Sequence, residues 1–263
     1  MGGDTIMLKN DKITIIFALM GILILLFITI PLANMIVSKI LEDPKILIET
    51  AQQPSVWKSI FLTSYTAFLA TVIAFIFGVP LAYLLARKDF FGKGFVEGII
   101  DVPIVVPHTV AGIALLTVFG VHGLIGQFSF IKFVDAIPGI VVAMLFVSVP
   151  FMINSAREGF ENIDPKLEHV ARTLGASHWQ SFLKISFPLA FRNIMVGAVM
   201  TWARAVSEFG AVVIIAYYPM VAPTLIYEKF LSEGLSASHP VAIILIVFCL
   251  IVFISLRLWV GRK

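Results

Sequence analysis

Two charged residues interrupt an otherwise apolar stretch of this chain. Arg204 and Glu208 stand four residues apart within residues 194–216, which carry no other charge. On a helix this spacing places both side chains on one face, where they can form an ion pair. A charged side chain costs about 2.5–3.5 kcal/mol at the bilayer centre if it faces lipid. We therefore expect the pair to face protein or a watery path, either as a structural ion pair or as a site that favours an anion.

Prolines and hydroxyl residues within the apolar stretches are further candidates for a translocation pathway. Pro103 and Pro107 interrupt residues 102–131, so we expect any helix there to begin irregularly. Hydroxyl groups could donate hydrogen bonds to an anion, although a lone hydroxyl in a span usually bonds to its own backbone. His108 is interpreted as a packing residue. The candidate pathway residues are Pro107, Thr109, Thr201, Arg204, Ser207 and Glu208.

A polar stretch, residues 158–192, has the pattern of a helix that ends in a turn. Its apolar residues are spaced by three and four, which predicts one helical face: Phe160, Ile163, Leu167, Val170 and Leu174. Asp164 and Pro165 are typical of a helix start. Gly175 is typical of a helix end, because glycine adopts the left-handed conformation without strain.

A second short helix is predicted directly after that turn. Ser177 and Gln180 have the spacing of a capping box. Pro188 disfavours helix at the residue before it, so this second helix should end near Ser186. A hairpin of two short helices cannot bury both of its faces alone. We therefore expect the rest of this chain or another protein to cover it.

The composition places these features in a membrane protein. Hydrophobic residues make up 59% of the 263 residues and charged residues only 13%, with a mean hydropathy of +1.00. These values exclude a soluble globule and a disordered chain. Five charge-free runs each reach the ~20 residues that a membrane-spanning helix needs. The runs are 13–38, 59–86, 102–131, 136–156 and 234–256, and residues 194–216 supply a sixth.

The distribution of charge predicts the orientation. Thirteen of the 19 Lys and Arg residues fall on one side of the six predicted spans and five on the other, and Arg204 lies within a span. The richer side should be cytoplasmic. The fold is therefore predicted to be an all-α polytopic membrane protein with six transmembrane helices and cytoplasmic termini. The single cysteine, Cys249, is read as a buried apolar residue, and no metal site is expected.

The polar hairpin resembles the signature loop of ABC importer permeases. In that signature a glutamate and two alanines precede a glycine, and an isoleucine and a proline follow after nine further residues. Glu168, Gly175, Ile185 and Pro188 occupy these places, and Ala171 stands one place late. The resemblance implies a type-I ABC importer permease fold. It also implies that residues 158–188 form the coupling helix that docks on an ATPase subunit. The coupling residues would be Glu168, Ala171, Gly175, Trp179, Phe182, Ile185 and Pro188, with Trp179 and Phe182 filling the partner's groove.

The resemblance also implies an organisation and a set of partners. Residues 57–257 would form the permease core, after a first span within residues 1–56 and before a basic tail, 258–263. The chain would form a homodimer in the cell membrane, with two ABC ATPase subunits and an external solute-binding protein. No cofactor is expected on this chain, because it lacks the G-x-x-x-x-G-K-[ST] motif; ATP and Mg would bind to the ATPase. Residues 157–192 hold five basic and four acidic residues, which argues against nucleic acid as a partner.

Two further stretches indicate the cargo. Residues 101–116 and 202–211 resemble corresponding spans of oxyanion permeases, most closely those for molybdate and tungstate. We therefore expect a transport subunit with no catalytic residues of its own. A permease of the same class for sulfate or another solute is the first alternative. A secondary transporter or channel is the second, and a membrane-embedded enzyme is disfavoured because no G-x-S-x-G surrounds Ser148.

Overall fold

The computed structural model describes residues 12–261, which fold into helices and connecting loops without a strand among them. The chain divides into two compact units, Met1–Gln52 and Gln53–Lys263. The first unit contains α1 (Lys12–Glu42) and α2 (Pro44–Ala51). α1 is apolar on all sides, and its most apolar window has no buried residue. Such a helix is suited to lipid. A carboxylate oxygen of Asp43 accepts hydrogen bonds from the backbone at the start of α2.

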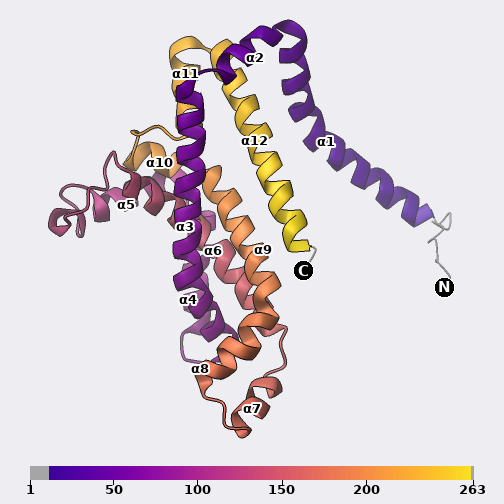
Figure 1. The fold of residues 1–263 in the computed structure, drawn as a ribbon, viewed down its shortest axis with the longest axis vertical. Coiled ribbons are helices and arrows are strands. Elements are labelled where there is room, and N and C mark those ends of the chain that lie inside the picture. Colours follow the sequence, from indigo (N-terminus) through magenta and orange to yellow (C-terminus); the bar gives the residue numbers. More distant parts are fainter. Residues whose placement is uncertain (1–11, 262–263) are drawn as a thin grey trace. The chain divides into compact units, whose positions relative to one another are not determined.

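The second unit contains the remaining helices, which Figure 1 shows as a bundle of long helices with short helices at its ends. Their bounds are α3 (Pro54–Arg87), α4 (Lys93–Val105), α5 (His108–Phe119), η1 (Gly126–Phe128), α6 (Ile137–Glu161), α7 (Lys166–Thr173), α8 (His178–Ser181), η2 (Phe182–Ser186), α9 (Phe187–Val206), α10 (Gly210–Ile215), α11 (Ala222–Glu233) and α12 (Leu235–Gly261). The described part of the predicted basic tail, 258–261, therefore continues α12.

Five of the described helical segments are long and apolar enough to cross a membrane, which confirms the predicted helical membrane fold. A sixth candidate is the pair α4 and α5, which are bent by 114° at the break between them. The irregular start predicted for the span over residues 102–131 is thus confirmed, and the irregularity is a complete break at Val106 and Pro107. Val106 is extended because it precedes Pro107, and Pro107 has no N–H to continue the helix.

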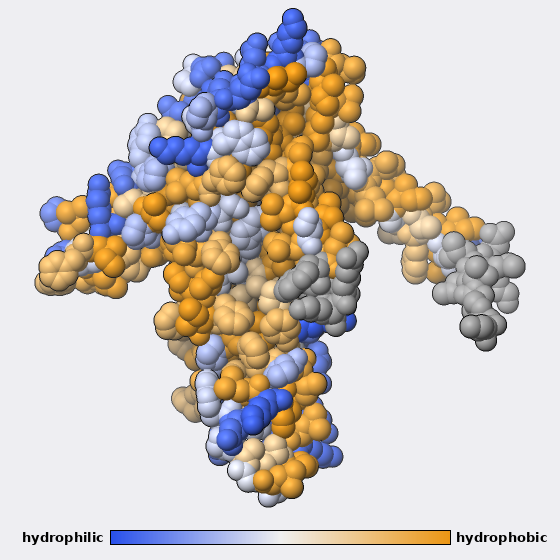
Figure 2. Space-filling view, viewed as in Figure 1, coloured by the Kyte–Doolittle hydropathy of each residue, from blue (hydrophilic) through white to orange (hydrophobic). Residues whose placement is uncertain are grey.

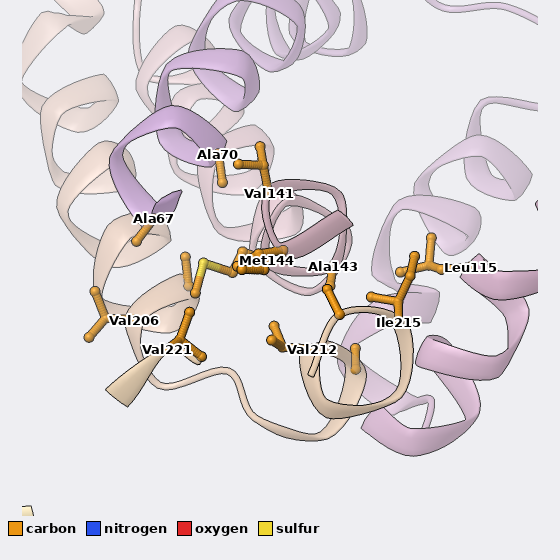
Figure 3. Close-up of a cluster of buried hydrophobic side chains, with 14 of the residues drawn as sticks. Ala67, Ala70, Leu115, Val141, Ala143, Met144, Val206, Val212, Ile215 and Val221 are labelled. Carbon is orange, nitrogen blue, oxygen red and sulfur yellow. The ribbon is translucent and has the colours of Figure 1, made fainter. Parts of the chain in front are cut away.

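Small residues let the central helices of the second unit approach closely. A Cβ added to Gly159 of α6 would lie 2.6 Å from Cβ of Asn193, and one added to Gly197 of α9 would lie 2.9 Å from Cβ of Ser155. Such contacts between small residues are typical of helix pairs in membranes. Figure 3 shows the neighbouring core, in which Met144 of α6 lies among side chains of α3, α5, α9 and α10.

The two ends of this bundle differ in their elements and charge. Figure 1 places α7, α8 and the loop after α3 at one end, and α11 at the other. The first end carries most of the Lys and Arg residues of this unit. In Figure 2, hydrophobic residues cover large areas of the long helices, and hydrophilic residues lie at both ends, the one with α11 and the one with α7 and α8. The positive-inside rule makes the end with α7 and α8 cytoplasmic.

Candidate functional site

The cytoplasmic hairpin forms much as its sequence predicts. α7 begins at Lys166, whose backbone N–H donates to the Asp164 carboxylate at 2.9 Å. Gly175 has φ +93°, a left-handed conformation that strains other residues. The capping box of the second helix has both of its hydrogen bonds, from Gln180 N–H to Ser177 Oγ and from Ser177 N–H to Gln180 Oε1. The predicted start, turn and capping box are confirmed.

The second helix does not end where we expected. It continues from α8 through a π-helical turn, η2, directly into α9, so one helical segment runs from His178 to Val206. The N–H of Phe187 donates to the carbonyl of Phe182, five residues back. This wider turn lets Pro188 occupy the first turn of α9, where its missing N–H costs little. The predicted end near Ser186 is therefore wrong.

The predicted apolar face of the hairpin is divided between two environments. Phe160, in the last turn of α6, and Ile163, in the turn after it, are buried, so the predicted single helical face is interrupted between α6 and α7. Leu167, Val170 and Leu174 are 48%, 58% and 83% exposed, so within this chain the apolar side of α7 lacks cover. A cytoplasmic helix that exposes three apolar residues in one row presents a surface for another protein.

Glu168 fixes the hairpin to the cytoplasmic end of α3. Its carboxylate accepts hydrogen bonds of 2.7 Å from Nε of Arg87, from the hydroxyl of Tyr83 and from Oγ of Ser186. Arg87 also donates to the carbonyl of Ile163 at 3.2 Å. Burial disfavours the ionised carboxylate, but these donors outweigh burial and lower the pKa of Glu168 below its ordinary value. The ion pair is nearly solvent-free, with side-chain exposures of 8% and 11%.

Sequence reasoning identified Glu168 but missed its partners. Tyr83 and Arg87 lie one helical turn apart, at and just after the end of the charge-free run 59–86. An arginine there is expected from the positive-inside rule alone, so the sequence carries no signal that it pairs with Glu168. Ser186 lies 18 residues after Glu168 and reaches it only because the π-helical turn follows α8 directly.

Aromatic residues pack beneath the hairpin. The ring of Phe182 lies 4.8 Å from that of Tyr83 and 6.0 Å from those of Phe160 and Phe187. Phe182 is half-buried and takes part in this internal packing, and its predicted role of filling a partner's groove stays a prediction. Trp179 stacks on Phe182 and is 66% exposed, so its predicted role stays a prediction. The other predicted coupling residues, Ala171 and Ile185, are half-buried, and Pro188 is exposed.

A cavity of about 790 Å³ lies between the end of α3 and the hairpin. Its lining combines apolar rings with basic side chains, among them Tyr83, Arg87, Lys88, Arg172 and Trp179. The cavity lies at the cytoplasmic end of the unit, and α7 lines it with Glu168, His169 and Arg172 rather than with its exposed apolar row.

A second cluster lies where two helices are interrupted. Nη2 of Arg204 donates to Oε2 of Glu208 at 2.9 Å, which confirms the predicted pair. Nδ1 of His108, the first residue of α5, lies 2.7 Å from the same carboxylate oxygen. The other oxygen accepts the N–H of Ala211 at 2.7 Å, in the first turn of α10. Glu208 is 1% exposed, so its charge is compensated inside the protein.

This arrangement corrects two predictions. The helix expected over residues 194–216 is broken at 207–209, because the Glu208 side chain binds the backbone N–H of Ala211 at the start of α10. His108 was interpreted as a packing residue, but its Nδ1 also lies 2.7 Å from the Glu208 carboxylate and 2.8 Å from Nη2 of Arg204. Gly210 explains how α5 and α10 come so close: a Cβ there would lie 2.6 Å from Cβ of His108. The sequence separation of 96 residues between His108 and Arg204 hides the contact.

Comparison with known proteins identifies the family. Residues 78–262 match the family described as "Binding-protein-dependent transport system inner membrane component". The chain belongs to this family. It is 48% identical over 256 residues to the molybdate/tungstate transport system permease protein WtpB of Thermococcus kodakarensis, covering 97% of this chain and 99% of the relative. A probable sulfate transport system permease protein of Marchantia polymorpha is 35% identical over 224 residues, covering 81% and 78%.

Solved structures of this class confirm the permease fold. A bacterial ABC transporter involved in the import of the acidic polysaccharide alginate has a chain that superposes with a TM-score of 0.75 at 17% identity, covering 97% of this chain and 96% of that chain. The MetNI methionine ABC transporter, in inward-facing conformations, gives a TM-score of 0.62 at 16% identity over 80% and 96%. The chain is therefore a multi-pass membrane transport subunit with the type-I ABC importer permease fold.

The permease exposes only some of its predicted pathway residues. Pro107, Thr109 and Ser207 are exposed, and the Arg204 side chain is 21% exposed. Thr201 is fully buried, and its hydroxyl has no hydrogen-bond partner among the described residues. Thr201 and Glu208 are thus buried within this chain, where Glu208 contacts Arg204, and their pathway role stays a prediction.

Proposed function

We propose that this permease carries molybdate or tungstate across the cell membrane, as the transmembrane subunit of an importer driven by ATP hydrolysis on a separate subunit. Relatives named for molybdate and tungstate transport support this cargo. They are 41–48% identical to this chain and align with nearly its whole length. The relatives named for sulfate are less similar and match less of the chain. Sulfate is therefore the second candidate.

The single observation that carries this proposal is the continuous helical segment His178–Val206. At its cytoplasmic end lie the hairpin and the exposed apolar row of α7. At its other end lies Arg204, in the last turn of α9. A partner that binds the hairpin therefore acts on the same helix that holds a positive charge within the membrane. Transport driven from the cytoplasm needs such a connection.

The hairpin is the proposed docking site for the ATPase. Its apolar row and Trp179 supply contact area, and Gly175 sets the turn between the two helices. The anchor between Glu168 and Arg87 ties the docked hairpin to α3, so a force on the hairpin reaches more than one span. ATP can change the state of the permease only if the ATPase binds the hairpin more tightly in one state than in the other.

We propose a homodimer whose two-fold axis contains the pathway. The Arg204 side chain is 21% exposed, and lipid against it would cost up to about 2.5–3.5 kcal/mol. The same side of α9 exposes Val196 and Met200, and α5 exposes Val110 and Ile113. A second copy of this chain against that side would replace lipid with protein and a watery path. An external solute-binding protein would deliver the anion to the end of the pathway opposite the cytoplasmic hairpin.

The test is transport by the reconstituted complex. The permease, its ATPase and its solute-binding protein would be placed in proteoliposomes, and internal tungsten and molybdenum measured by mass spectrometry. We expect uptake that needs ATP, the ATPase and the binding protein together. Uptake of sulfate without tungstate or molybdate would overturn the cargo. Uptake by the permease alone would instead indicate a secondary transporter or channel.

A further inference from the structure

The two interrupted helices bring their broken ends together at one place. α5 begins at His108, after the break at Pro107, and α9 ends at Val206. A Cβ added to Gly210, just past the end of α9, would lie 2.6 Å from Cβ of His108 and 3.4 Å from the backbone N of Thr109. The first turn of α5 therefore lies directly against the 207–210 loop, beside Arg204. Helix interruptions of this kind often form ion sites in membrane transporters, with the start of a half-helix facing the anion.

The polar side chains of this cluster differ in their exposure to solvent. Glu208 is 1% exposed, and both of its carboxylate oxygens have partners within the chain. One contacts Arg204 and His108, and the other accepts the N–H of Ala211. The side chains of Arg204 and His108 are 21% and 43% exposed. The carboxylate is thus hidden behind the two groups that it orients. An approaching anion meets the guanidinium and the imidazole before it meets the negative charge.

Hydrogen-bond donors remain available at this surface. Nη2 of Arg204 faces Glu208 and His108, and Nη1 faces the Ser207 hydroxyl at 3.2 Å. Since a guanidinium has five N–H groups, two of them have no partner within the described chain. The exposed Ser207 hydroxyl already donates to the carbonyl of Arg204 at 3.0 Å, so the further donors at this surface are the first N–H groups of α5, which a helix leaves unpaired. Molybdate, tungstate and sulfate are tetrahedral dianions that accept hydrogen bonds, and the donors here match that chemistry.

We propose that Arg204 and the first turn of α5 form a transient binding site for a tetrahedral oxyanion during its passage, with Ser207 holding the Arg204 guanidinium from the side. His108 and Glu208 are positioning residues, which hold the guanidinium at the break. This inference rests on the proposed function and adds the place at which the anion is held. Binding should be weak, because the single exposed cation is already partly compensated by Glu208 and a pathway site must release its ion.

The test measures the local electrostatic potential from the rate at which a cysteine beside the site is modified by charged reagents. In the reconstituted complex, with Cys249→Ala as background, Thr109→Cys would report on the site. Thr117→Cys, exposed on the same helix but about 12 Å along its axis, is the matched control. Rates of modification would be compared for a negatively and a positively charged methanethiosulfonate reagent. We expect the ratio of negative to positive to be about tenfold higher at Thr109→Cys than at Thr117→Cys, as for a nearby unit charge.

Two further measurements link that potential to the anion. Arg204→Gln should abolish the difference between the reporters, and Arg204→Lys, which keeps the charge, should retain it. Tungstate at millimolar concentration should slow modification of Thr109→Cys about threefold or more and leave Thr117→Cys unchanged. Since these reporters work with Arg204 in place, a folding defect of the Arg204 variants leaves the test intact.

The outcomes separate this site from the proposed cargo. Equal reagent ratios at the two reporters would overturn the site, as would uptake of tungstate by a complex that shows no protection at Thr109→Cys. Protection by sulfate in a complex that imports only sulfate would support the site and overturn the proposed molybdate or tungstate cargo.

Discussion

Arg87→Met should release the hairpin from α3. Arg87 and Glu168 form an ion pair with side-chain exposures of 8% and 11%, and removing one partner of such a pair typically costs about 3–5 kcal/mol. Tyr83 and Ser186 still donate to Glu168 in the variant, so we take the lower end, about 3 kcal/mol. At about 1.4 kcal/mol for each factor of ten, local opening of the hairpin should become about 100-fold more frequent.

Amide hydrogen exchange of residues 166–174 in lipid nanodiscs measures this opening directly. Lys88→Met is the matched control, because it removes the adjacent positive charge, which has no ion pair among the described residues. Adding Glu168→Gln to Arg87→Met should restore at least half of the lost protection, since no buried charge then lacks its partner. Exchange in Arg87→Met within threefold of the Lys88→Met rate would refute the anchor. ATP-driven uptake should fall together with protection.

Three further predictions follow from the same structure. Gly175→Pro should leave the protein inserted but abolish ATP-driven uptake, because proline cannot adopt φ +93°; normal uptake would contradict the coupling role of the turn. Thr201→Val should leave uptake unchanged and the unfolding temperature equal or higher, because the buried Thr201 hydroxyl gains no hydrogen bond within the described chain. A large loss of uptake would contradict this expectation and support the pathway role of Thr201. The pKa of Glu168 is lowered from 4.5, so its contribution to the stability of the hairpin is fully present above that value and is lost as pH falls through the folded-state pKa. Hydrogen exchange of residues 166–174, corrected for intrinsic rates, should therefore stay constant from pH 7 to 5 and rise below pH 5. Glu168→Gln should remove this pH dependence.

Local chemistry made much of the hairpin predictable. Gly175 and the Ser177–Gln180 capping box act on their own backbone within three residues, so the sequence alone determines their conformation. The membrane spans were predictable for a similar reason, because lipid requires long apolar helices whatever their neighbours.

Contacts between distant segments were not predictable in the same way. Arg87 and Glu168 are 81 residues apart, and His108 and Arg204 are 96 residues apart. Each residue has an ordinary local explanation: a flanking arginine, a loop glutamate or a packed histidine. The predicted helix end near Ser186 was wrong for the opposite reason. The local rule that proline disfavours helix at the residue before it was overridden by a π-helical turn, which removes the need for the N–H that Pro188 lacks.

The continuity of α8, η2 and α9 constrains how the transporter can work. The segment His178–Val206 has 29 residues, which at 1.5 Å per residue is about 43 Å. A hydrogen-bonded helix scarcely stretches, so a displacement of the hairpin must tilt the helix or rearrange the π-helical turn. Tilting is limited where Gly159 and Gly197 allow α6 and α9 to touch, because any added atom there would clash. Motion at the hairpin should therefore pivot α9 about these glycine contacts and shift Arg204, so that binding of the ATPase and exposure of the anion site change together.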